Sequence, residues 1–145
     1  MITIKCILMY SMLKMGMDSS KIITLEYYSI PFSQMFPTNI DKSDFEDLTS
    51  LYMKYKVQDI EYNQRLISQF NNLVVDTSVS IEDFQDFRCL VILNGSAKNK
   101  IKLWVSSTGY ILNNDVVYKR DYKFLTTLLE PLPEHFQNIK IDSNQ

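Results

Sequence analysis

The second half of the chain alternates short apolar runs with turn-forming residues, and this pattern restricts the fold more than any other feature. The apolar runs cover residues 87–93, 100–106, 110–112 and 116–119. The residues that separate them are Asn94-Gly95, Ser107-Thr108-Gly109 and Asn113-Asn114-Asp115. Such residues favour turns, and short connections make successive strands run antiparallel. The pattern therefore predicts a β-meander.

Two helices are predicted around this meander. The first begins after Asp59, where apolar residues recur at helical spacing; they are Ile60, Leu66, Ile67, Phe70, Leu73 and Val74, with Asn63 as the one polar member. The second begins after Asp121 and ends before Pro131, and its apolar stripe comprises Phe124, Leu125, Leu128 and Leu129. Each helix has one apolar stripe, so each is expected to cover a sheet.

The first half adds two further strands and a short helical turn. Residues 21–30 are rich in β-branched and aromatic side chains, and residues 51–58 alternate with period two. Residues 43–46 have the spacing of a capping box, which starts a helical turn. The predicted fold is a single α+β domain at residues 21–132, an antiparallel β-meander sheet packed on one face by two helices. Its expected core joins Leu66, Phe70, Leu103, Leu125 and Leu128.

The two ends are expected to lie outside this domain. Residues 1–20 resemble the beginning of a secretory signal, but Lys14 interrupts the apolar stretch and no small-residue cleavage site follows. That stretch is too short to cross a bilayer, so we expect no transmembrane segment. Residues 133–145 are expected to form a loosely held tail. The expected compartment is the cytoplasm, with export as the alternative if the leader acts as a signal.

Composition argues against several functions. The formal net charge of the 145-residue chain is −2, which gives no reason to expect a nucleic-acid partner. Only three glycines occur, and Gly16, Gly95 and Gly109 are too far apart to form a phosphate-binding loop. We therefore expect no cofactor.

The candidate catalytic or metal-binding residues are few. Two acidic groups stand out: Asp41, Asp44, Glu46 and Asp47 form one, and Glu82, Asp83 and Asp86 form the other. Either group is able in principle to hold a hard cation or to supply an acid and a base. The single histidine, His135, has no partner at ligand spacing. Cys89 lies inside an apolar run and is expected to be a buried structural thiol.

The strand at residues 100–106 carries the most specific functional hypothesis. Alternation places Ile101, Leu103 and Val105 on one face, and Lys100, Lys102 and Trp104 on the other. If the first face packs on the helices, the only tryptophan points outward between lysines. An exposed Trp104 flanked by cations is a natural interface anchor, so we predict Trp104, Lys100 and Lys102 as binding residues.

The order of elements also suggests a class of function. A strand, a proline loop, a helix and a meander, followed by a helix that ends in Leu-Glu-Pro-Leu-Pro, resemble the organisation of many small bacterial proteins, some of which neutralise a toxin. The likeness contains no specific motif. The preferred hypothesis is a non-enzymatic domain that docks a folded partner protein, as immunity proteins and inhibitors do. The alternatives are a small hydrolase that uses an acidic group, and a structural or assembly subunit.

Overall fold

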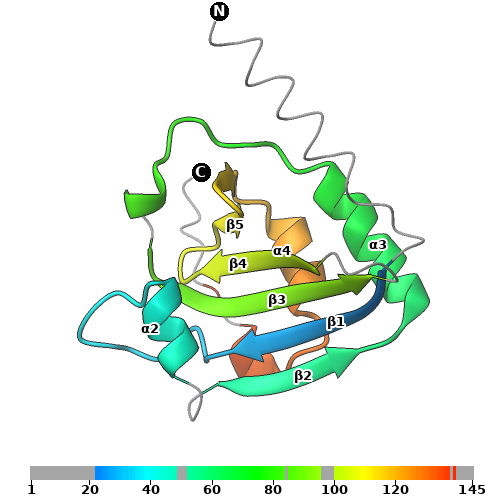
Figure 1. Cartoon of the computed structure of the whole chain (residues 1–145), viewed down its shortest axis with the longest axis horizontal. Coiled ribbons are helices and arrows are strands. Elements are labelled where there is room, and N and C mark those ends of the chain that lie inside the picture. The colour runs from blue at the N-terminus through cyan, green and yellow to red at the C-terminus, as the bar shows by residue number, and fades with distance from the viewer. Residues whose placement is uncertain (1–21, 49–51, 84, 96–99, 138, 140–145) are drawn as a thin grey trace, which may run out of the picture.

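The fold is built around one antiparallel sheet of six strands in the order β2-β1-β3-β4-β5-β6 (Figure 1). The computed structural model describes residues 22–48, 52–83, 85–95, 100–137 and 139. The strands are β1 (Ile22–Ser29), β2 (Met53–Val57), β3 (Phe87–Gly95), β4 (Lys100–Ser106), β5 (Ile111–Asn113) and β6 (Val116–Tyr118). The helices are α2 (Lys42–Asp47), α3 (Ile60–Asn71) and α4 (Tyr122–Leu129), with short 3-10 helices η2 (Ile81–Asp83) and η3 (Glu134–Phe136). The predicted single α+β domain is confirmed.

The predicted end of one strand differs at the connection between β3 and β4. Asn94 pairs with Lys100, so the Asn94-Gly95 turn signal belongs to the end of β3. Residues 96–99, between the two strands, lie outside the described residues. The leader at residues 1–20 also lies outside them. Within the described part of the chain, no helix has the length and apolar character needed to cross a membrane.

Each of the described helices α2, α3 and α4 begins after an aspartate that accepts a hydrogen bond from the backbone N–H three residues later. The donors lie 2.8 Å from Asp41, 3.0 Å from Asp59 and 2.9 Å from Asp121. The carboxylate satisfies an N–H group that the first turn of a helix leaves without an intrahelical acceptor. The starts of α3 and α4 match the prediction. The predicted capping box at residues 43–46 does not start α2, because Asp41 is the actual cap.

The inner face of the sheet packs against α3 and α4 and contains the main core. All five residues predicted to meet there, Leu66, Phe70, Leu103, Leu125 and Leu128, belong to one buried cluster. Ile60 and Val74 are exposed, although the helical stripe was expected to bury them. Phe136 is only 7% exposed and joins the same cluster, so packing continues into the segment expected to form a loose tail.

Gly109 shows how tightly α4 is packed against the end of β4. Its φ angle is +91°, in the left-handed region that other L-residues rarely adopt. A Cβ atom at this position would lie 3.0 Å from Leu125 Cδ1. The turn predicted at residues 107–109 therefore needs glycine for its backbone and for the space beside α4.

The outer face of the sheet carries a second core beneath α2 and the loop that precedes it. Trp104 points to this face, as its alternation predicts, but only 4% of the residue is exposed. Phe45 of α2 packs edge-on against the indole at a centroid distance of 5.5 Å, and Phe87 lies at 5.3 Å. The predicted exposure of Trp104 is therefore wrong. The covering segment is remote in sequence from β4, so strand alternation alone does not reveal it.

We predict that Trp104→Ala lowers the free energy of unfolding by about 3–5 kcal/mol, because truncation of a buried aromatic leaves a cavity. Native fluorescence of Trp104 should be blue-shifted and insensitive to iodide. Lys102→Ala, an exposed position two residues away, should change stability by less than about 0.5 kcal/mol. Denaturant titration of the two variants provides the comparison, and a readily quenched tryptophan would contradict the buried position.

Candidate functional site

The outer face has a second half that α2 does not cover, and it forms a lysine-rich surface. The strand register aligns Lys56, Glu26, Ile92 and Lys102 in one row across β2, β1, β3 and β4. Lys54 and Tyr28 lie beside one another in the next row, and Lys100 pairs with Asn94 on the other side. The open face is defined here as Glu26, Tyr28, Lys54, Lys56, Ile92, Lys100 and Lys102.

Charge and partial burial distinguish this open face from the rest of the outer side. Its four lysines are exposed, whereas Glu26, Tyr28 and Ile92 are half-buried. The Lys54 Nζ atom lies 5.9 Å from the ring centroids of both Tyr28 and Tyr52, a distance suited to cation–π contact. The face therefore combines apolar side chains with a surplus of positive charge, although the chain as a whole carries a formal charge of −2.

Of the three predicted binding residues, the structure places two on this surface. Lys100 and Lys102 are exposed, while Trp104 lies under α2 and is unable to act as an exposed anchor. The sequence analysis missed Lys54 and Lys56 as members of the site. Their alternation was visible, but the pairing of β2 with β1 was not.

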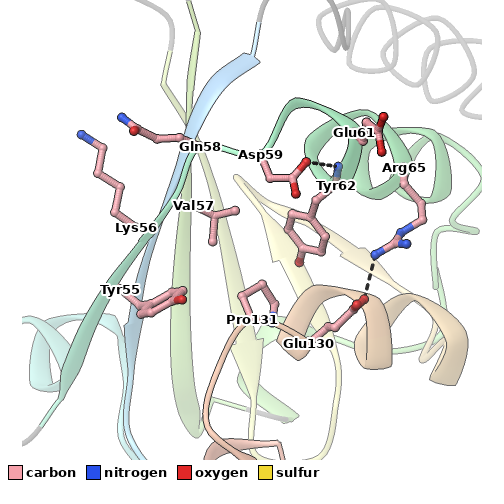
Figure 2. A pocket seen from close by; sticks show the side chains of 10 residues that line it. All are labelled: Tyr55, Lys56, Val57, Gln58, Asp59, Glu61, Tyr62, Arg65, Glu130 and Pro131. Carbon is pink, nitrogen blue, oxygen red and sulfur yellow. Dashed lines mark hydrogen bonds and ion pairs between the residues drawn. The ribbon is translucent and has the colours of Figure 1, made fainter.

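An open groove lies along β2 on the opposite side of the sheet. It has a volume of about 750 Å³, and it is bounded by β2, the start of α3 and the end of α4. Figure 2 shows Tyr55 and Val57 on the same side of β2 as Tyr62 and Pro131, whereas Lys56 points away from them. An ion pair of 2.8 Å between Arg65 and Glu130 joins the two helices at this groove.

The wall of the groove is fixed by two tyrosines that bind the end of α4. The hydroxyls of Tyr27 and Tyr62 lie 2.8 Å apart. Tyr62 donates to the carbonyl of Thr127 at 2.7 Å, and the single proton of the Tyr27 hydroxyl has two acceptors at 2.8 Å, the Tyr62 oxygen and the carbonyl of Leu128. Burial raises the pKa of Tyr27 well above its ordinary value, and burial also raises that of Tyr62. Both phenols are thus held neutral as structural hydrogen-bond donors.

Three members of the two acidic groups have structural contacts. Asp41 caps α2, Asp83 accepts hydrogen bonds from Ser80, and Asp86 forms an ion pair with Arg88 at 2.7 Å. The groove is lined by other carboxylates. Among the described residues, no three or more His, Cys, Asp or Glu side chains gather closely enough to hold a metal ion.

The remaining candidates also have structural surroundings. His135 is exposed, and its ring lies 4.3 Å from that of Phe136. Cys89 is fully buried as a free thiol, and burial raises its pKa to about 12. Such a thiol is a poor nucleophile near neutral pH, because the thiolate is the reactive form.

Comparison of this chain with protein-family models, with curated proteins and with solved structures gives no match.

We predict that alkaline pH destabilises the fold through Tyr27 and Tyr62. Their folded-state pKa values are raised, so the stability they contribute is fully present below their ordinary value of 10.0 and is lost as the pH rises above it. Tyr27→Phe should cost about 1 kcal/mol at pH 7 and should make the loss above pH 10 smaller. Urea unfolding between pH 7 and 11 measures both effects.

Tyr122→Phe is the matched control, because Tyr122 is 72% exposed. It should leave the free energy of unfolding and its alkaline slope unchanged. If the free energy of unfolding fell equally with rising pH for Tyr27→Phe and for the unmodified chain, the buried tyrosine pair would not control this pH dependence.

Proposed function

We propose that this protein is a non-enzymatic binding domain that docks an acidic, folded partner protein through the open face. The observation that carries the proposal is the row Lys56, Glu26, Ile92 and Lys102, in which exposed lysines lie on both sides of the half-buried Glu26 and Ile92. Ile92 and Tyr28 supply half-buried apolar area inside a polar rim, which is the usual anatomy of a protein–protein interface.

Electrostatics support a partner with negative surface charge. Lys54, Lys56, Lys100 and Lys102 all belong to the open face, where Glu26 is the only carboxylate. Complementary charge of this kind raises association rates and discriminates among partners. Immunity proteins and inhibitors act by the same kind of tight surface docking, and we propose that mode of action here.

The alternative functions receive less support from the geometry. A hydrolase based on the acidic groups would need them around one cavity, but Asp41, Asp83 and Asp86 make separate structural contacts. An assembly subunit would need a self-complementary sheet edge. The described edge strand β2 carries Lys54 and Lys56, and these charges would repel a second copy.

We predict that the double variant Lys54→Glu, Lys102→Glu binds the partner with an association rate constant at least about tenfold lower. The partner is first captured from the native host with the unmodified chain and then purified. Binding kinetics at several salt concentrations provide the measurement. The unmodified chain should show a steep salt dependence, and the variant a shallow or inverted one.

The matched control is Lys119→Glu, Lys123→Glu, which makes the same change in net charge at exposed positions outside the open face. This control should retain the association rate of the unmodified chain within about twofold. Equal losses in the two double variants would mean that net charge, not the open face, governs binding. An unchanged rate in the Lys54, Lys102 variant would overturn the proposal.

A further inference from the structure

The two edges of the sheet differ in how the described residues cover them. At one edge, Val75 pairs with Tyr118 of β6, and two backbone hydrogen bonds of 2.7 and 2.8 Å attach residues 74–76 to residues 117–119. At the other edge lies β2, which pairs with β1 on one side only among the described strands. The backbone of β2 therefore presents a ladder edge to which a strand is able to add.

Strand alternation identifies the backbone groups that point outward from this edge. The N–H of Ile30 donates to the carbonyl of Arg88 at 2.8 Å, so it points towards β3. The backbone N–H and C=O groups of every second residue in an extended strand point the same way. Those of Tyr28 and Glu26 therefore point towards β3, and those of Tyr27 point towards β2. Lys54 pairs with Tyr28 and Lys56 pairs with Glu26, so the backbone N–H and C=O groups of both lysines point away from β1. Tyr55 pairs with Tyr27, and its backbone groups point towards β1.

The side chains on either side of this edge differ in chemistry. On the outer side, Lys54 and Lys56 are exposed. On the inner side, Tyr55 and Val57 border the groove (Figure 2), which has a volume of about 750 Å³. Tyr55 is 44% exposed. The groove also contains the carboxylates of Asp59, Glu61 and Glu130, which disfavour an acidic side chain there.

We infer that an extended segment of the partner protein adds to β2 as a further strand, with acidic residues beside Lys54 and Lys56 and apolar or aromatic residues in the groove. Because side chains of a strand alternate between its two faces, the segment reads acidic–apolar–acidic with period two. This inference rests on the proposed function, since the segment belongs to the same partner. It adds the backbone contact and the sequence pattern that the partner must have.

Charge complementarity favours such a segment over a second copy of this chain. Antiparallel pairing of two β2 strands about Tyr55 would place Lys54 of one copy opposite Lys56 of the other. Like charges directly opposite one another destabilise a strand pair. The same lysines that discourage self-pairing are attractive to a strand that carries carboxylates.

The probe for this inference is an acetylated and amidated heptapeptide, Glu-Tyr-Glu-Val-Glu-Tyr-Glu, added to the full chain. We expect saturable binding, and we expect the amides of Lys54 and Lys56 to gain protection from hydrogen exchange. A peptide with lysine in place of every glutamate should not bind. No saturable binding of the acidic peptide at millimolar concentration would overturn the inference.

Two variants at one position separate backbone pairing from side-chain attraction. Lys56→Pro removes both the charge and the outward N–H, whereas Lys56→Ala removes the charge alone. Lys56→Pro should bind the peptide about tenfold more weakly than Lys56→Ala, which corresponds to the loss of one hydrogen bond. Equal affinities of the two variants would show that the peptide does not pair with the edge of β2.

N-methylated peptides test the same contact without changing the protein. One heptapeptide is methylated on the backbone nitrogens of its odd residues and another on those of its even residues. A strand with a single neighbour donates hydrogen bonds from only one of these two sets of N–H groups. One methylated peptide should therefore retain affinity, and the other should lose it. Loss or retention in both would overturn strand addition.

The outcomes distinguish this inference from the proposed function. If charge reversal at Lys54 and Lys102 slows association of the purified partner, but Lys56→Pro and Lys56→Ala bind it equally, the docking proposal stands and strand addition fails. If charge reversal has no effect, the docking proposal fails. Concentration-dependent dimerisation that Lys56→Pro abolishes would assign the edge to a second copy and overturn the inference.

Discussion

The partly buried ion pair between Asp86 and Arg88 is the constraint on which the outer layer depends. The guanidinium donates to both carboxylate oxygens, at 2.7 and 3.0 Å, and only 5% of the Arg88 side chain is exposed. The same carboxylate accepts the backbone N–H of Ile40 at 3.0 Å, and the carbonyl of Ile40 accepts from Phe87 at 2.7 Å. Loss of the Asp86 carboxylate would leave the charge of the buried Arg88 without this partner, which is strongly destabilising. The chain ahead of α2 is thereby tied to the beginning of β3.

This attachment divides one face of the sheet into two environments. Near the first residues of β3, α2 lies over the sheet (Figure 1), and its Phe45 packs on the buried Trp104. Towards the other end, Ile92 is half-buried and lies between Glu26 and the exposed Lys102 in its row. The sheet has a buried core on both faces, yet one region of its outer face remains accessible. The strands of that region also contribute side chains to the core on the inner face.

The sequence predicted local structure well because local rules decide it. Asp59 and Asp121 mark helix starts through their own side chains, and the alternation of residues 100–106 assigns each one to the correct face. Those rules do not specify what lies over a face. The cover of Trp104 comes from residues near Phe45, about 60 positions earlier. Ile60 is the first residue of α3 and precedes the residues of that helix that are buried, so it is exposed.

The candidate site was predicted only in part for the same reason. Lys100 and Lys102 were identified from their own strand. Their grouping with Lys56 depends on three strand pairings: β2 with β1, β1 with β3, and β3 with β4. Register between distant strands is a tertiary property, set by which apolar residues meet on the inner face. The groove depends in addition on how α3 and α4 meet near β2.

Cys89 gives the interior a built-in chemical reporter. Its thiol is fully buried on the inner face of β3, next to Ser29 on one neighbouring strand and Val105 on the other. A reagent in water reaches the sulfur only when the packing between this face and the helices opens, and the exposed thiol then regains ordinary acidity. The rate of alkylation at this one atom therefore measures how often the main core opens, independently of any event at the surface where a partner would bind.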